Sequence, residues 1–398
     1  MIYVFTLMNK LAIISTHPIQ YNAPFFKLLT ERNNIKIKVF YTWSQSENNK
    51  KYDPGFDRII AWDIPLLDGY DYLFVKNISK NPGSHHYNGI NNPTLIEEIK
   101  AWKATAVMLY GWNFKSHLNA LKYFKNKIPV LFRGDSTLLD EKAGLKKILR
   151  RLFLRYIYSY VDIGLYTGKA NNAYFKAHGF YNDNLVWLPH AVENKRFQSS
   201  QNIQQEAELL KKSLLISNDA LVFLFAGKLE QKKQPEFLLD VFCQVADNST
   251  ILLIVGNGIM EKELKEKYFN HPQVRFLDFV NQQQMPSIYA CGDVFILPSK
   301  GPGETWGLSI NEAMAAGKAV ITSDACGAFF DLIIQERNGF VFKKNNPETL
   351  KNCMQYFIKN KFASKGMGQQ SFKIVQEFSF ENGCIALEKV LLNKIKKK

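Results

Sequence analysis

Two carboxylates in the second half of the chain, Glu304 and Glu312, flank the start of an expected helix. Residues 294–297 form an apolar run typical of a buried strand, a Gly/Pro-rich loop follows, and residues 308–316 favour a helix that Gly317 can end. Ligands of parallel sheets bind beyond the carboxyl ends of the strands, and the N–H groups at a helix start favour phosphate. The segment therefore predicts a phosphate site with one carboxylate on either side, and we expect Glu312 to be a ligand contact outside the hydrophobic core.

Backbone amides are the expected partners of that phosphate. The amides lie near Gly307, Leu308 and Ser309 at the helix start, and Lys228 and Lys233 follow an earlier apolar run. Preorganised cations and amides stabilise the negative charge that develops on a departing diphosphate. The alternative for the lysines is a strand end with both side chains in solvent.

Elements that could position these groups recur along the whole chain. Short apolar runs alternate with longer amphipathic stretches, which predicts parallel sheets covered by helices. The expected strands are 11–15, 35–41, 106–110, 130–132 and 163–166, and then 221–225, 251–255, 274–277, 294–297 and 319–321. A chain of 398 residues is long for one hydrophobic core, so we expect two α/β domains, 1–200 and 201–375.

The segment around Glu304 and Glu312 also resembles a known family. Their spacing matches the E-x7-E signature of retaining glycosyltransferases with the GT-B fold, in particular glycosyltransferase family 4. The surrounding Pro298-Ser299, Gly307-Leu308 and Glu-Ala-Met-Ala-Ala-Gly317 are similar to the donor-site block of that family. The resemblance implies two Rossmann-like domains facing a central cleft, with residues 376–398 forming a helix that crosses back to the first domain.

The resemblance assigns roles to the charged residues. It implies that Glu304, Lys228 and Lys233 serve catalysis, with the lysines clamping the donor diphosphate and Glu304 orienting the sugar hydroxyls. Glu312 would bind the ribose. Lys228 stands where the family usually has arginine, which keeps the charge but loses the bidentate fork.

A second stretch resembles the part of the family site that holds the nucleotide base. Gly256 corresponds to a glycine turn after a strand, and the backbone of Phe279 and Val280 matches the segment that reads the base. Asp278 departs from the glycine that is common there.

The first half resembles the family only in topology. His17 and Gln20 follow the first expected strand, and Arg133 and Asp135 follow a later one, so all four are candidates to face the acceptor or the donor phosphates. Capping or buried polar roles are the alternative for His17 and Gln20.

The function that this resemblance implies is transfer of a sugar, hexosyltransferase-type, from a nucleoside diphosphate sugar to a glycan or lipid-linked acceptor in cell-envelope polysaccharide synthesis. No D-x-D motif occurs in the chain, so we expect no metal and no other cofactor. A sugar-nucleotide 2-epimerase of the same fold and a non-catalytic basic binding protein are the alternatives. No nucleic-acid recognition motif is present, so nucleic acid is not an expected partner.

Positive charge is concentrated in the first half of the chain. Residues 1–197 hold 27 lysines and arginines against 15 aspartates and glutamates. Within them, residues 144–158 read as an amphipathic helix whose cations flank a wide apolar face. This helix either lies on an anionic membrane surface or packs its apolar face on the sheet. With no recognisable leader and five widely spaced cysteines, we expect a cytoplasmic protein, peripheral on the inner face of the membrane in the first case.

Overall fold

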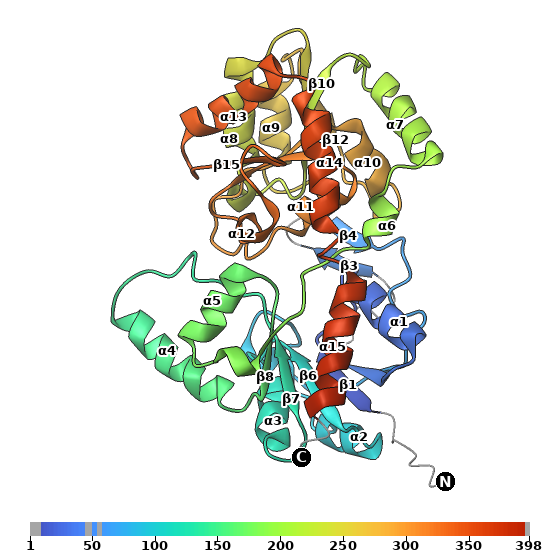
Figure 1. Cartoon of the computed structure of the whole chain (residues 1–398), viewed down its shortest axis with the longest axis vertical. Coiled ribbons are helices and arrows are strands. Elements are labelled where there is room, and N and C mark those ends of the chain that lie inside the picture. Colours follow the sequence, from blue (N-terminus) through green and yellow to red (C-terminus); the bar gives the residue numbers. More distant parts are fainter. Residues whose placement is uncertain (1–8, 44–49, 54–57, 395–398) are drawn as a thin grey trace. The chain divides into compact units, whose positions relative to one another are not determined.

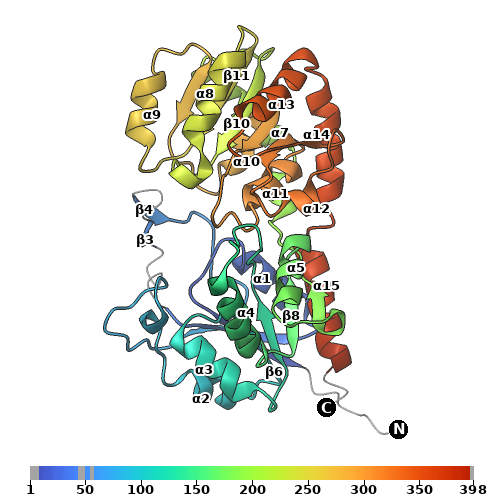
Figure 2. The same ribbon diagram turned by 90° about the vertical axis from the view of Figure 1, so that its left-hand side faces the viewer.

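A computed structural model of the chain describes residues 9–43, 50–53 and 58–394 (Figure 1). The chain divides into two compact units, of which the first contains residues up to 51, 65–189 and 380–398 and the second contains 52–64 and 190–379. Helices cover both faces of the main sheet in each unit (Figures 1 and 2). The expectation of two Rossmann-like α/β domains is confirmed.

The sheet of the first unit has seven parallel strands within the described residues, in the order β5-β2-β1-β6-β7-β8-β9. The strands are β1 (Lys10–Ser15), β2 (Lys36–Tyr41), β5 (Tyr72–Phe74), β6 (Ala106–Tyr110), β7 (Val130–Arg133), β8 (Ile163–Tyr166) and β9 (Leu185–Trp187). The helices are α1 (Ala23–Arg32), α2 (Leu95–Ala101), α3 (Lys115–Phe124), α4 (Leu145–Tyr158), α5 (Lys169–Ala177) and α15 (Phe380–Lys394), with short 3₁₀ turns at Tyr87–Gly89 and Asn182–Asn184.

The second unit repeats this arrangement with six parallel strands in the described part of the chain, in the order β12-β11-β10-β13-β14-β15. The strands are β10 (Leu221–Ala226), β11 (Thr250–Val255), β12 (Val274–Leu277), β13 (Val294–Leu297), β14 (Ala319–Ser323) and β15 (Gly339–Phe342). The helices are α6 (Asn194–Phe197), α7 (Gln201–Ser213), α8 (Pro235–Val245), α9 (Glu261–Tyr268), α10 (Met285–Cys291), α11 (Leu308–Ala315), α12 (Phe329–Leu332), α13 (Pro347–Lys359) and α14 (Ala363–Val375), with a 3₁₀ turn at Gln231–Lys233.

The central strands are apolar along their whole length because both faces of a parallel sheet are covered. Every residue of β10, β11 and β13 is buried. The core of the second unit is built from these strands and from α8 and α13, with Phe223, Phe242, Leu252 and Phe357 fully buried. A separate two-stranded sheet is formed by β3 (Lys50–Asp53) and β4 (Arg58–Ala61).

The strand order of the second unit reverses between β10 and β13. The chain runs outward from β10 through β11 to β12, and then returns to the other side of β10 to form β13. In open α/β sheets, ligands bind at such a switch point, beyond the carboxyl ends of the two strands. The segments that follow β10 and β13 contain Lys228 and Glu304, so the fold brings the two expected halves of the site to one edge.

The last helix, α15, is part of the first unit. Its Glu388 accepts two hydrogen bonds from the guanidinium of Arg32 in α1, at 2.7 and 2.8 Å. Phe380 at its start contacts Phe25, with ring centroids 6.1 Å apart. The sequence predicted domain boundaries after residues 200 and 375. In the structure, the chain passes from the first unit to the second after Pro189 and returns to the first after Ser379.

Candidate functional site

The loop between β13 and α11 requires glycine at position 307, because any other residue there would displace neighbouring side chains. Gly307 precedes the first residue of α11 and has a φ of 98°, in the left-handed region. A Cβ at this position would lie 2.7 Å from Cys326 Sγ and 2.8 Å from Leu297 Cδ2. The helix therefore starts close to the end of β13. The amides of Leu308 and Ser309 lie in its first turn, where a helix has no carbonyl of its own to pair with them.

Glu304 and Lys233 are in direct contact. Lys233 Nζ lies 2.5 Å from Glu304 Oε2, and the hydroxyl of Ser299 donates to the same oxygen at 3.0 Å. The lysine side chain is 17% exposed and the glutamate side chain 9% exposed. Two residues that the sequence assigns to one site, 71 positions apart, thus form a sheltered ion pair. A phosphate that enters here competes with Glu304 for the lysine ammonium.

Glu312 lies in the second turn of α11, as expected, but in a different environment. It is 3% exposed, and its Oε2 accepts a hydrogen bond of 2.7 Å from the hydroxyl of Tyr289 in α10. The expectation that this carboxylate stands outside the core is wrong, because α10 covers it. Glu304 is also buried, with 8% of the whole residue exposed.

The beginning of α11 is held by a short chain of hydrogen bonds. Trp306 Nε1 donates to Asn311 Oδ1 at 2.8 Å, and Asn311 Nδ2 donates to the carbonyl of His190 at 3.0 Å. The His190 and Trp306 rings are also neighbours, with centroids 5.8 Å apart. These contacts fix the loop that contains Glu304.

The turns after β10 and β11 lie against each other. Gly256 has a φ of 133°, and a Cβ there would lie 2.0 Å from the carbonyl oxygen of Gly227. This close approach requires glycine and places the half-buried Lys228 beside the turn. The prediction that Gly256 forms a turn after a strand is confirmed, and its role toward a nucleotide stays a prediction.

The segment expected to bind the nucleotide base is held in place by side-chain contacts that we did not predict from the sequence. The backbone N–H of Phe279 donates to Asn257 Oδ1, and Asp278 pairs with Lys265 at 2.6 Å. The ring of Trp62, which belongs to the second unit, lies 6.5 Å from that of Phe279. Phe279 and the adjacent Val280 are half-buried. Asn257 lies between two glycines and could have been found by that pattern, whereas nothing in the sequence links Trp62 to Phe279.

The candidates of the first half lie at or beyond the carboxyl ends of their strands. His17 follows β1 and packs edge-on against Trp43, with ring centroids 5.4 Å apart, and Gln20 is half-buried in the turn before α1. Asp135 is exposed after β7. Arg133 is buried, and its guanidinium donates to the carbonyls of Leu188 at 2.5 Å and Pro189 at 3.2 Å. These bonds give Arg133 a structural role in holding the end of the first unit.

A buried histidine lies at the same edge of the first sheet. His117 Nδ1 is 3.0 Å from the carbonyl oxygen of Gly111, and its Nε2 is 2.9 Å from the Thr42 hydroxyl. The carbonyl can only accept, so Nδ1 carries the proton. Nε2 is then an acceptor that shares the Thr42 hydroxyl with the carbonyl oxygen of Ser15, which lies 3.2 Å from that hydroxyl. Burial lowers the pKa of His117 to about 4, so the ring is neutral at pH 7.

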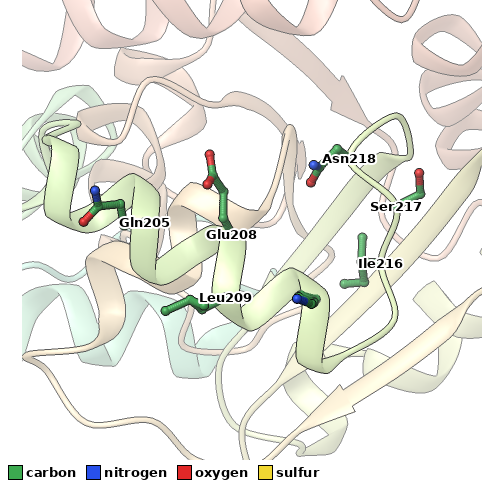
Figure 3. A pocket seen from close by; sticks show the side chains of 7 residues that line it. Gln205, Glu208, Leu209, Ile216, Ser217 and Asn218 are labelled. Carbon is green, nitrogen blue, oxygen red and sulfur yellow. The ribbon is translucent and has the colours of Figure 1, made fainter.

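A surface hollow of about 650 Å³ lies on the second unit (Figure 3). It is lined by side chains of α7 and of the loop that leads to β10, among them Gln205, Glu208 and Leu209. None of the expected site residues contributes to its lining. Among the described residues there is no group of three or more His, Cys, Asp or Glu side chains placed to hold a metal ion. No helix in the described part of the chain combines the length and apolar character needed to cross a membrane.

The second unit matches a known family. Residues 206–373 match the family model described as glycosyl transferases group 1. The matched segment includes the 3₁₀ turn with Lys233, the loop with Glu304, and all of α11. The stretch around Glu304 and Glu312 that resembles a GT-B donor site therefore lies within the matched segment.

Curated relatives align with parts of the chain. An uncharacterized glycosyltransferase of Methanocaldococcus jannaschii is 29% identical over 154 residues, which cover 37% of this chain and 39% of the relative. The UDP-Gal:alpha-D-GlcNAc-diphosphoundecaprenol alpha-1,3-galactosyltransferase of Escherichia coli is 27% identical over 173 residues, which cover 42% of this chain and 43% of the relative. The alignments thus span less than half the length of these two relatives.

Solved structures show the fold over nearly the whole chain. Sucrose-phosphate synthase from Thermosynechococcus elongatus aligns with a TM-score of 0.72 at 17% identity, covering 98% of this chain and 100% of that chain. Anabaena HepE in complex with UDP and glucose aligns with a TM-score of 0.70 at 16% identity, covering 96% and 99%. The predicted GT-B fold is confirmed by these likenesses.

Proposed function

We propose that the chain is a retaining, hexosyltransferase-type enzyme of glycosyltransferase family 4 that moves a sugar from a nucleoside diphosphate sugar to a glycan or a lipid-linked acceptor. The observation that carries this proposal is the ion pair between Lys233 and Glu304 beside the start of α11, inside the segment that matches the glycosyltransferase model. A cation, helix-start amides and a carboxylate at one switch point are what a sugar diphosphate requires.

In the proposed reaction, the bond between the anomeric carbon and the β-phosphate oxygen breaks, and the acceptor oxygen bonds to that carbon on the same face. The acceptor proton passes to the leaving nucleoside diphosphate. Lys228, Lys233 and the amides of Leu308 and Ser309 stabilise the charge that develops on this phosphate. No metal takes part, because the cations and amides supply the positive charge.

The two carboxylates have different tasks in this proposal. Glu304 exchanges its contact with Lys233 for hydroxyl groups of the sugar when the diphosphate binds. Glu312, whose orientation is fixed by Tyr289, accepts hydrogen bonds from the ribose hydroxyls. Gly256, Phe279 and Val280 hold the nucleoside.

The acceptor is proposed to bind the first unit, near His17, Gln20 and Asp135. The named activity of the Escherichia coli relative, which concerns UDP-galactose and a diphosphoundecaprenol-linked sugar, supports UDP-sugars as the first donors to test and a lipid-linked acceptor. A structural neighbour, WaaG, is described as involved in lipopolysaccharide biosynthesis. We propose the same setting, synthesis of envelope polysaccharide at the cytoplasmic side.

The test is to incubate the protein with UDP-glucose, UDP-galactose and their N-acetyl forms, with and without a diphosphoundecaprenol-linked sugar, and to follow release of UDP. Proton NMR of the product reports its anomeric configuration. Acceptor-dependent release with an α-linked product from an α-linked donor is expected. Release of a free 2-epimer would instead support the epimerase, and no turnover of any nucleotide sugar would contradict the proposal.

A further inference from the structure

Helix α4 exposes an unusual number of large apolar side chains. Six of them, all between 50% and 70% exposed, lie within its 14 residues: Leu145, Ile148, Leu149, Leu152, Phe153 and Tyr156. Exposed apolar side chains are ordinary when scattered, but a contiguous patch of this size marks a surface that meets a partner. Figure 1 shows α4 along the margin of the first unit, with α5 beside it.

The exposed apolar residues form one face of the helix. At about 100° per residue, the six side chains fall within an arc of about 140°. The opposite side carries Leu154, Ile157 and Tyr158, which are buried against the first unit. The alternative that the whole apolar face packs on the sheet is therefore wrong, because only these three side chains do so.

Cations border this apolar face. Lys146, Arg150 and Arg155 are exposed. At the same rotation per residue, Lys146 lies about 20° outside one edge of the apolar arc, Arg155 lies about 20° outside the other edge, and Arg150 lies about 60° outside the first edge. Lys147 and Arg151 instead pair with Glu141, at 2.8 and 2.9 Å. The helix itself contains no acidic residue.

We propose that α4 docks the protein on the surface of an anionic lipid bilayer, with the apolar face in the headgroup boundary and the bordering cations on lipid phosphates. The combination of a wide apolar face, cations on both borders and no acidic residue is that of a helix lying in the membrane interface. Aromatic side chains next to α4 are of the kind that lies at the level of the lipid headgroups. Trp112 contacts Phe153, with ring centroids 5.6 Å apart, and the Tyr160 hydroxyl donates to Tyr156 at 2.7 Å.

The charge pattern favours lipid over a second copy of the chain. A symmetric dimer through this face would bring the same patch of both copies together, so cations would face cations without acidic partners on α4. An anionic bilayer offers the complementary charge along both borders. The inference rests on α4 alone and stays independent of the donor site.

The experiment is co-sedimentation of the full chain with vesicles of phosphatidylcholine, with and without phosphatidylglycerol. We expect binding to the anionic vesicles only, and release by about 0.5 M salt, at which the Debye length falls well below 10 Å. A basic residue near such a surface contributes about a fivefold factor. The double variant Lys146→Glu and Arg150→Glu should therefore partition at least 25-fold more weakly.

A second variant tests the apolar face separately. Leu149→Ser with Leu152→Ser removes two exposed side chains and should reduce partitioning at least tenfold, because burial of apolar area supplies the rest of the affinity. Matched controls on the second unit are Lys212→Glu with Lys262→Glu for charge, and Leu209→Ser with Phe362→Ser for exposed apolar area. Both controls should bind as the wild type does.

Three results would overturn the proposal. The first is wild-type protein that stays in the supernatant with anionic vesicles at low salt, and the second is α4 variants that sediment as well as the wild type. The third is a wild-type dimer in analytical ultracentrifugation that Leu149→Ser with Leu152→Ser dissociates, which would assign the face to a second copy. All variants should keep the wild-type melting temperature and its shift with UDP, so loss of vesicle binding cannot be confused with misfolding or with failure of the donor site.

Discussion

The hydroxyl of Tyr289 donates a hydrogen bond of 2.7 Å to Glu312 Oε2, and both residues are buried. The bond holds the carboxylate in one orientation, in which we propose that it binds a ligand. If that ligand is the ribose, Tyr289 acts on donor binding without touching the donor. Tyr289 would then be a positioning residue, and Glu312 the residue that binds the ligand.

Tyr289→Phe should therefore weaken donor binding mildly and Glu312→Gln more strongly. Loss of one neutral hydrogen bond costs about 0.5–1.5 kcal/mol, so we expect a two- to tenfold increase in Kd for Tyr289→Phe. Glu312→Gln removes the charge from the ligand contact and should exceed this. Isothermal titration with UDP measures both, and equal effects of the two variants would contradict the distinction. Glu312→Ala is a poorer test, because it also leaves a cavity around a buried side chain.

Lys233→Ala should weaken binding of nucleoside diphosphates by about 10- to 150-fold, since a charged hydrogen bond contributes about 1.5–3 kcal/mol. It also leaves Glu304 buried without its cation, so the melting temperature should fall. Lys232→Ala is the matched control, because the neighbouring lysine pairs instead with Glu230 at 3.5 Å. Wild-type affinity in folded Lys233→Ala would remove this lysine from the site.

Turnover should survive EDTA. In the proposed mechanism, two lysines and helix-start amides take the place of the metal cation that would otherwise hold the diphosphate. The measurement is the rate of UDP release before and after chelation, followed by addition of magnesium or manganese. Loss of activity that either ion restores would show that a metal takes part.

His117 should make the first unit less stable in mild acid. Its folded pKa is about 4 against about 6.5 when unfolded, so between these values the unfolded chain binds more protons. The free energy of unfolding should then fall by up to ~3 kcal/mol as the pH drops from about 6.5 to about 4. Urea titrations across this range should show a smaller loss in His117→Gln. The exposed His85→Gln serves as control, and identical pH dependence in His117→Gln and the wild type would refute the assignment.

Periodicity predicted the central strands of both sheets because they are mostly apolar and are buried on both faces. The three-residue strands β5 and β9 lack that signal, since their residues are at most half-buried. The resemblance around Glu304 placed Lys233 in the same site, and the two are in contact. Burial of Glu312 was missed because its cover, Tyr289, comes from another helix. The contact of Trp62 with Phe279 was missed because it joins segments more than 200 residues apart, and such pairings are set by tertiary packing.

We propose that the second unit binds a nucleoside diphosphate through Lys233 and the start of α11. Isothermal titration of the wild type with UDP, GDP, ADP and CDP tests it most directly, with Lys233→Ala and Lys232→Ala titrated in parallel. We expect that at least one of the four nucleotides binds with 1:1 stoichiometry and that only Lys233→Ala weakens this binding. Absence of binding by all four to the folded wild type, or equal affinity in Lys233→Ala, would contradict it.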